Sequence, residues 1–371
     1  MSKKECSCSQ KVPERLNKVG GQAVLEGVMM KAGERTVTTC RKEDGTLTVN
    51  DSRFVSVRKK HKILNIPIIR GIVNFAEMLI LSVKTLNISA EALDIDTEKD
   101  KQKKAEGKKT TTDIVMIFSL IISVFIVIGL FILLPGYTSD LVAFIFKKLF
   151  NVKIGATVKA IIEGVAKVII FILYLVFASL LPDIKRTFMY HGAEHKSIAC
   201  FESGTELTPE NAKNYTRFHP RCGTSFMFVM ILLGVAVGII LNNVFVGMER
   251  WLISLIRLAI VPLVVGLGYE FIIFAGKHDN PVTRALSAPG LWMQRITTKE
   301  PTEDMLEVAI ISIKCALRDE FPEFKEFFDS KEWLPKTEEL TEDTSPDNPE
   351  EKTGEPDESV SCTKENTEDE E

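Results

Sequence analysis

Two long runs of residues without a charged side chain constrain the fold more than any other feature. Ile114–Leu134 has 21 such residues and Thr224–Met248 has 25. A helix needs about 20 mostly apolar residues to cross the hydrocarbon core of a bilayer. Two further apolar stretches, Ala160–Leu181 and Trp251–Ala275, each contain two ionisable residues. The sequence therefore predicts four transmembrane helices.

A fifth apolar stretch, Pro67–Ala92, has a polar stripe. Ionisable residues recur along it at seven-residue intervals, at Arg70, Glu77, Lys84 and Glu91. This spacing predicts a helix with one polar seam that is buried on nearly every other side. Lysines crowd both flanks, and loops rich in Lys and Arg stay on the cytoplasmic side of a membrane. We therefore interpret the stretch as an in-plane or re-entrant helix, with a fifth span as the alternative.

The N-terminal region predicts a small antiparallel β-sheet. Thr36–Arg41 and Thr46–Val49 are β-prone runs around Asp44-Gly45, a dipeptide typical of hairpin turns. Phe54–Arg58 is expected to supply a third strand. The glycines of Gly20–Met30 indicate tight turns or close backbone approach.

The fold class that follows is a mainly α membrane protein. It has four transmembrane helices, an in-plane or re-entrant helix and a small N-terminal antiparallel β-sheet. We expect eight segments: a disordered tail (1–18), a small β domain (19–62), the amphipathic in-plane helix with a charged linker (63–112), transmembrane helices one and two (113–182), a His-rich cytoplasmic loop (183–222), transmembrane helices three and four (223–276), a cytoplasmic helical segment (277–334) and an acidic disordered tail (335–371).

Charge and cysteine content indicate the surroundings of the chain. Residues 336–371 carry a net charge of −12, which leaves +8 on the remainder. Because the basic excess lies beside the apolar runs, the expected partner is anionic membrane lipid, not nucleic acid. The polar N-terminus lacks an apolar core, and we therefore expect no signal peptide. Seven cysteines fit a reducing compartment without disulfides. The distribution of Lys and Arg places both termini in the cytoplasm.

The candidate site begins with an H-x-x-E-H pattern. His191, Glu194 and His195 lie on a predicted helix that Pro182 opens and that runs to about Glu202. Two histidines one helical turn apart can share a divalent metal ion, with the carboxylate beside them as a general base. Gly192 inside this helix costs roughly 1 kcal/mol relative to Ala, which predicts close packing at that point.

Further ligands come from other parts of the chain. His219 and Cys222, three residues apart, precede the third span on the same predicted side. Glu270, near the cytoplasmic end of the fourth span, is a possible additional ligand, because an ionisable residue at membrane depth usually has a functional role. Imidazole with thiolate favours zinc. The hypothesis is a zinc site of His191, His195, His219 and Cys222 with Glu194 as the catalytic base.

Each element of this hypothesis has a plainer alternative. His191 and His195 can pack structurally at the level of the lipid headgroups. His219 and Cys222 can cap the third span. The 75-residue distance from His195 to Glu270 is similar to that in inverted zincin proteases, but those enzymes are soluble. Ion pairs within one helix explain Glu163 and Lys167, with Lys159 as a further member. Cys6 and Cys8 alone make no closed metal site.

Several long motifs in fixed order resemble one family. They are Gly20–Met30, Tyr190–Glu202, Arg217–Phe226, Ser287–Gln294 and Thr297–Ala309. Over about residues 18–320 they resemble the YqhQ-like bacterial membrane proteins, a family of unknown function often described as predicted metal-dependent enzymes. The resemblance implies a multi-pass protein of the bacterial cell membrane with a proposed metal site.

Three functions remain open from the sequence. The first is a metal-dependent hydrolase in the membrane that acts on a lipid-linked or membrane-protein substrate. The second is a non-enzymatic scaffold or regulatory factor whose metal, if present, is structural. The third is a transporter, suggested by the ionisable residues of the spans, although the four spans show no repeated halves.

Overall fold

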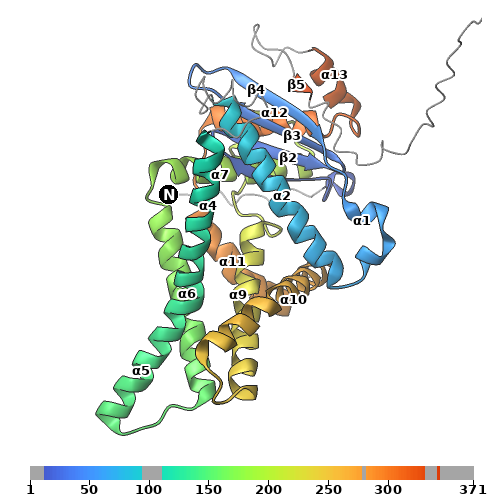
Figure 1. Ribbon diagram of the computed structural model, residues 1–371. Coiled ribbons are helices and arrows are strands. Elements are labelled where there is room, and N and C mark those ends of the chain that lie inside the picture. The colour runs from blue at the N-terminus through green and yellow to red at the C-terminus, as the bar shows by residue number, and fades with distance from the viewer. Residues whose placement is uncertain (1–11, 94–110, 278–280, 331–340, 343–371) are drawn as a thin grey trace, which may run out of the picture.

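The polar and apolar parts of the sequence separate in space into two layers. The computed structural model describes residues 12–93, 111–277, 281–330 and 341–342. The strands, α7 (Pro182–Glu202) and α12 (Glu303–Ala316) form the upper layer in Figure 1, and most of the long apolar helices form the lower one, while α2 (Ile69–Ala92) runs beside the sheet. Among the described residues, five helices are long and apolar enough to cross a membrane. The chain is therefore a mainly helical, multi-pass membrane protein with a small sheet.

The sheet is a meander of four antiparallel strands. They are β1 (Val19–Val24), β2 (Gly27–Ala32), β3 (Arg35–Arg41) and β4 (Leu47–Arg53), in that spatial order. The two-residue strand β5 (Thr341–Glu342) pairs with β4 in parallel. The predicted hairpin around Asp44-Gly45 is confirmed, with Gly45 at a φ of 86°.

The glycine-rich stretch Gly20–Met30 forms the first hairpin, β1 and β2, which had been expected only as turns. The expected close approach is confirmed, since a Cβ on Gly21 would lie 2.6 Å from the Met29 carbonyl oxygen. The predicted strand at Phe54–Arg58 is wrong. Ser56 caps the short helix α1 (Val57–Lys60), and Glu77 accepts hydrogen bonds from both Ser56 Oγ and Val57 N. These bonds hold the chain in a helical turn where a strand was expected.

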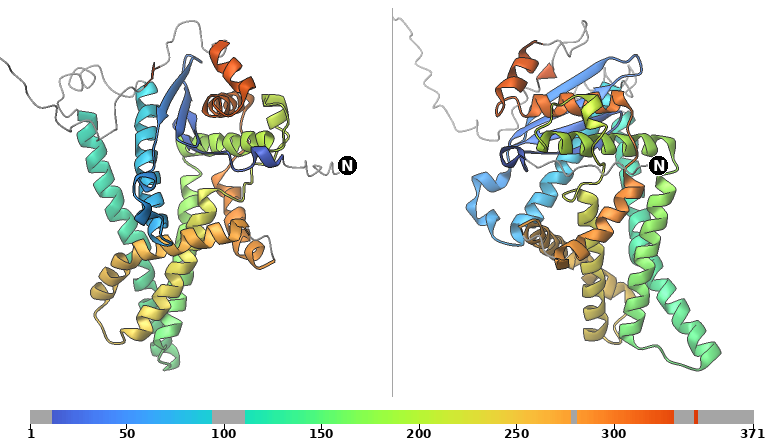
Figure 2. Two further views of the ribbon diagram at one scale, coloured as in Figure 1. Left: turned by 90° about the vertical axis from the view of Figure 1, so that its right-hand side faces the viewer. Right: turned by 180° about the vertical axis from the view of Figure 1, so that it is seen from behind.

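Helices cover both faces of the sheet (Figure 2, left). On one face, Val28 and Met30 of β2 share a core with α7 (Pro182–Glu202) and α12 (Glu303–Ala316). On the other face, Met29 packs with Leu81 of α2 (Ile69–Ala92). Because successive side chains of a strand point to opposite faces, β2 is buried on both sides. We call the sheet with α7 and α12 the head.

Of the predicted polar seam of α2, Glu77 is buried, Arg70 and Lys84 are half-buried and Glu91 is exposed. The buried face of the helix also contains Leu81, Thr85 and Ser89, whereas apolar residues such as Ile80 and Val83, whose burial the sequence predicts, are exposed. This mostly polar buried face meets the head, where Ser82 Oγ donates to Gln22 of β1. In a membrane protein an apolar helix face can contact lipid, so the side kept from lipid is the polar one.

The first predicted span continues far beyond its expected end. Helix α4 (Thr111–Ile128), the π-helical turn η3 (Gly129–Leu133) and α5 (Leu134–Phe150) follow one another without a break. The charge-free run ends at Leu134, but the helix continues to Phe150. Proline lacks the N–H that a regular turn requires, and the widened turn η3 directly before Pro135 accommodates it.

The remaining long helices complete the lower layer, which we call the bundle. They are α6 (Ala156–Ala178), α9 (Gly223–Val244), α10 (Arg250–Lys277) and α11 (Pro281–Thr297). Helix α11 leads from the bundle to the head (Figure 1), and its Met293 packs on Phe171 and Leu175 of α6. Small residues allow close helix contacts, for example Gly164 of α6 against Val235 of α9.

The predicted helix at Pro182–Glu202 is confirmed, with Pro182 in the first turn of α7. Three short elements pack on α7 or α12 of the head: η1 (Pro13–Arg15), α8 (Pro209–Ala212) and α13 (Pro322–Ser330). A further short helix, η2 (Lys62–Asn65), precedes α2. Some predictions concern residues outside the described ranges. They are the Cys6/Cys8 pair, most of the N-terminal tail, most of the charged linker and, apart from β5, the acidic tail.

Candidate metal centre

Helix α7 places the H-x-x-E-H pattern at the junction of head and bundle. From Tyr190 to Glu202 nearly all its residues are buried between the sheet, α12 and the segment that follows α11. A Cβ on Gly192 would overlap the carbonyl oxygen of Lys299, so only glycine fits this contact. This is the close packing predicted from the cost of a glycine inside a helix.

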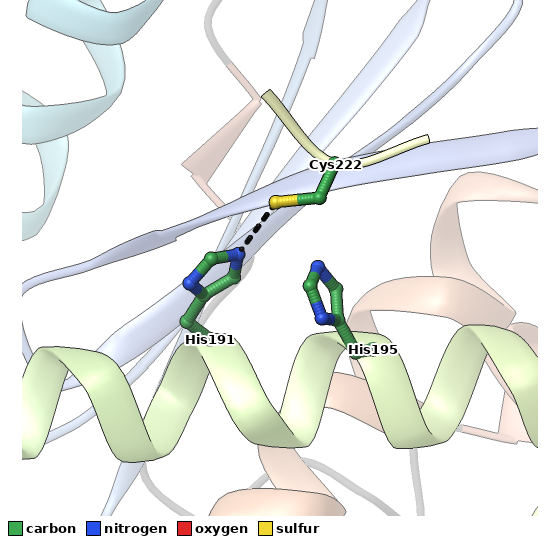
Figure 3. Close-up of side chains that lie close together, drawn as sticks. All are labelled: His191, His195 and Cys222. Carbon is green, nitrogen blue, oxygen red and sulfur yellow. Dashed lines mark hydrogen bonds between the residues drawn. The ribbon is translucent and has the colours of Figure 1, made fainter. Parts of the chain in front are cut away.

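Three potential ligands converge on one point. One ligand atom from each of His191, His195 and Cys222 lies within 4.8 Å of the other two. Figure 3 shows the two imidazoles rising from the same side of α7 towards the thiol, with His191 Nε2 3.2 Å from Cys222 Sγ. The His191 and His195 ring centres are 4.4 Å apart. Among the described residues, this is the group that could hold a metal ion.

Backbone carbonyls fix the orientation of both imidazoles. His191 Nδ1 lies 2.9 Å from the Thr297 oxygen, and His195 Nδ1 lies 2.6 Å from the Arg217 oxygen. A carbonyl can only accept a hydrogen bond, so each Nδ1 carries a proton, and in the neutral imidazole Nε2 is the nitrogen with the free lone pair. Metal-binding histidines are commonly oriented in this way. The Cys222 thiol can then donate to His191 Nε2.

His219 lies beside the group, with its ring centre 5.5 Å from that of His195. Its Nε2 accepts a hydrogen bond from Arg221 Nη2 at 3.2 Å. Its backbone is held by Gln294 of α11, which accepts from His219 N and donates to His219 O, both at 2.8 Å. The converging ligand set therefore contains Cys222 but not His219.

Cys222 is the N-cap residue of α9, which matches the position of the capping alternative. Its side chain forms no cap hydrogen bond. Instead, Cys222 Sγ faces His191 and accepts a hydrogen bond from Thr224 Oγ1 at 3.3 Å. The start of α9 thus positions the Cys222 thiol, and the thiol contacts His191 instead of capping the helix.

Glu194 points to the sheet. It is 5 % exposed, and the Gly21 N–H of β1 donates to its carboxylate. Burial raises the pKa of Glu194 to about 7, against the lowering effects of His191 and of the Gly21 amide. A carboxyl group with a pKa near neutrality can exchange a proton at physiological pH.

Glu270 lies away from the histidines. Its carboxylate forms two bonds with Arg70 of α2, from Arg70 Nε at 2.7 Å and Nη2 at 2.5 Å. It also accepts from Ile68 N at 3.3 Å, where Ile68 has a φ of 71°. A β-branched residue is strained in this conformation. The Glu270 pair thus fastens the start of α2 to α10, and the structure does not bring it into the ligand set.

The ionisable residues of the second span form ion pairs within their own helix and also with other helices. Glu163 pairs with Lys167 at 3.0 Å, as expected, and also with both terminal nitrogens of Arg257 on α10. Arg257 Nη2 also donates to Asn242 of α9 at 3.0 Å. Lys159 pairs with Asp140 of α5. These contacts link the bundle helices to one another.

Sequence reasoning missed the groups that support the ligands. The carbonyls of Thr297 and Arg217 and the amide of Gly21 are backbone groups, and no residue type signals them. Gln294 was detectable in principle, because a buried amide on a helix face otherwise packed with apolar residues needs a polar partner.

Comparison with known proteins identifies the family. A family model described as "Protein of unknown function (DUF1385)" matches residues 66–319. "Uncharacterized protein YqhQ" of Bacillus subtilis (strain 168) is 35 % identical over 312 residues, which cover 81 % of this chain and 92 % of that protein. No solved structure matches. A membrane protein with this order of motifs, matched over most of its length, belongs to the DUF1385 family.

Proposed function

We propose that this protein is a zinc-dependent hydrolase of the bacterial cell membrane, with its metal centre at the junction of head and bundle. The observation that carries the proposal is the convergence of His191, His195 and Cys222 within 4.8 Å. Catalytic zinc sites have three protein ligands and one position open to water or substrate. Bound zinc would supply a Lewis acid and a nucleophile at neutral pH.

The donor set fits zinc better than a harder ion. Two imidazoles and a thiolate are ligands for zinc, whereas magnesium and calcium prefer oxygen. The thiol proton that faces His191 Nε2 would leave when the metal binds, because the ligand is the thiolate. The carbonyls of Thr297 and Arg217 would keep both rings aimed at the ion without rearrangement.

Glu194 is the proposed general base. Its role also distinguishes a catalytic metal site from a structural one. In the enzyme, Glu194 takes a proton from the attacking water, a role that suits its pKa of about 7. In the alternative, the protein is a non-enzymatic scaffold or regulatory factor with a structural metal. The observation that favours this alternative is the hydrogen bond from Gly21 N–H to Glu194, which links α7 to β1.

A comparison of Glu194→Gln with His195→Ala tests the proposal. Purified full-length protein is analysed for zinc by elemental mass spectrometry, and each variant is tested for rescue of a deletion phenotype in the source bacterium. We expect roughly one zinc ion per chain in the wild type and in Glu194→Gln. His195→Ala should lose the metal, because two ligands remain.

The phenotype then distinguishes the two versions of the site. A general base predicts that Glu194→Gln keeps zinc, keeps its melting temperature and fails to rescue. Full rescue by Glu194→Gln would contradict the hydrolase and leave the structural metal. Wild-type protein that neither carries zinc nor binds it on titration would contradict both versions.

We further propose a topology of four spans with both termini in the cytoplasm and with α2 in plane or re-entrant. The lysines on both flanks of α2 support this orientation, as does the contact of its mostly polar buried face with the head. Single cysteines at Lys60 and Lys104, in a variant that lacks the native cysteines, test it. Labelling of both positions from the cytoplasmic side is expected. Labelling from opposite sides would make α2 a fifth span.

A further inference from the structure

An apolar groove lies directly beside the candidate metal centre. It has a volume of about 340 Å³ and is lined by Phe218, Ala288, Leu291, Trp292 and Arg295. Its lining is almost wholly apolar, and Trp292 is 51 % exposed. Binding pockets for small apolar ligands have volumes of about 300–1,000 Å³. The groove is therefore large enough for part of a chain-like ligand.

The groove follows from the two faces of α11. Ala288, Leu291, Trp292 and Arg295 have the spacing of one helix face and form its outer side. The inner side carries Met293 and Ile296, which pack against α6 and α9 in the bundle. Phe218 from the loop before α9 closes the groove. The inner side anchors α11, so the outer apolar stripe has a fixed position at the end of the bundle.

Charge distinguishes the groove from an ordinary lipid-facing surface. Arg295 is exposed in the last turn of α11, at the end of the groove nearer the head. Within the described ranges, no carboxylate forms an ion pair with it. An apolar channel with an unpaired guanidinium at one end is complementary to a molecule with a hydrocarbon chain and an anionic head.

We propose that the groove binds a glycerophospholipid with an anionic headgroup from the adjoining leaflet. One acyl chain lies along Leu291 and Trp292, and the phosphate pairs with Arg295. Tryptophan suits this position because its ring is apolar and its N–H is polar. The apolar faces of α6 and α10 are also exposed, so a lipid can enter from the bilayer without crossing water.

The groove shares its walls with the supports of the metal ligands. Phe218 follows Arg217, whose carbonyl holds His195, and Arg295 is two residues before Thr297, whose carbonyl holds His191. A lipid in the groove would thus present its headgroup side to the zinc centre. The assignment of a lipid as the substrate class rests on the proposed function, but binding of the lipid does not.

Photocrosslinking tests the lipid site without reference to activity. Full-length protein is placed in nanodiscs of phosphatidylcholine that contain a trace of a diazirine acyl probe, with either a phosphatidylglycerol or a phosphatidylcholine headgroup. Labelled peptides are identified by mass spectrometry. We expect the phosphatidylglycerol probe to label Phe218 and the 288–295 segment in preference to the phosphatidylcholine probe.

Variants make the test specific to the groove. Leu291→Trp fills the groove and should abolish the preferential labelling, whereas Leu258→Trp on the exposed face of α10 should not change it. Arg295→Gln should lower the preference about fivefold, the loss expected for one cation near an anionic headgroup. The matched control is Lys147→Gln, an exposed cation on α5. Melting temperatures establish that each variant is folded.

Each result separates the lipid site from the metal centre. Equal labelling by the two probes, or unchanged preference in Leu291→Trp, would overturn the lipid site while leaving the zinc result intact. Preferential labelling in protein that binds no zinc would keep the lipid site and contradict the hydrolase.

Discussion

The head and the bundle bury opposite kinds of side chain. The head encloses a contiguous apolar core in which Phe201, Leu306 and Ile313 are fully buried. The bundle exposes most of its large apolar side chains and buries small or polar residues, such as Ser139, Glu163 and Gly164. Lipid is as apolar as leucine, so helices in a membrane gain little by hiding leucine from it.

The difference teaches where specificity resides in each layer. In the head, the volume of the core side chains selects the packing. In the bundle, a few polar contacts and close approaches at glycine select which helices meet. The candidate metal centre lies between the two layers, and its ligands come from both: His191 and His195 from the head, Cys222 from the start of a bundle helix.

The sharpest test of this contrast is Glu163→Leu in the bundle. The substitution adds apolar surface but leaves Arg257 and Lys167 without their shared carboxylate. Loss of one partner of a buried pair costs about 3–5 kcal/mol. We expect a marked fall in the melting temperature in detergent, and a smaller fall for Glu163→Gln, which keeps a hydrogen-bonding oxygen but also leaves both cations without a counter-charge. Equal stability of Glu163→Leu and wild type would show that the charges do not hold the bundle together.

A pair of leucine truncations compares the two layers directly. Leu306→Ala creates a cavity in the head, where Leu306 is fully buried, and should cost about 2–5 kcal/mol. Leu258→Ala on α10, where the leucine is 49 % exposed, should leave the melting temperature within about 1 °C of wild type. Hydrogen exchange of α12 should accelerate only in Leu306→Ala. A similar loss in both variants would contradict the contrast.

A smaller loss of stability is expected when a methyl group is added at Gly192, at the junction of head and bundle. Gly192→Ala places a Cβ against the Lys299 carbonyl oxygen, and overpacking of this kind costs about 1–3 kcal/mol. Gly234→Ala in α9 is the control, because a Cβ there meets no atom within 4 Å. Thermal unfolding should show a loss for Gly192→Ala only. If alanine is tolerated at residue 192, the 299–301 segment does not pack as closely as described.

The features predictable from the sequence were those set by local pattern. Charge-free runs identified the apolar helices, Asp44-Gly45 identified a hairpin, and Pro182 identified the start of α7. The spacing of His191 and His195 identified one face of a helix. Of the two further ligands expected from the sequence, the structure brings Cys222 to this face but not His219. The cost of Gly192 correctly predicted a close contact, although not its partner.

The remaining features depend on contacts between distant segments. Nothing near Glu270 in sequence indicates Arg70, and nothing near Phe54–Arg58 indicates that Glu77 converts this segment into a helical cap. The two strands in Gly20–Met30 were not predicted, because glycine has low strand propensity. The extension of the first span through Pro135 depended on a π-helical turn that no composition pattern reveals.

The shared core of the head sets an order of events during synthesis. The four strands are complete once residue 53 has left the ribosome, but one face of the sheet packs against α7 and against residues 305–316 of α12. Domains generally fold as units as they emerge, and N-terminal parts are available first. Here the apolar side chains on one face of the sheet stay uncovered until α12 emerges, after all the apolar helices have been synthesised. Thr297, which orients His191, also emerges late. Metal loading would therefore follow membrane insertion.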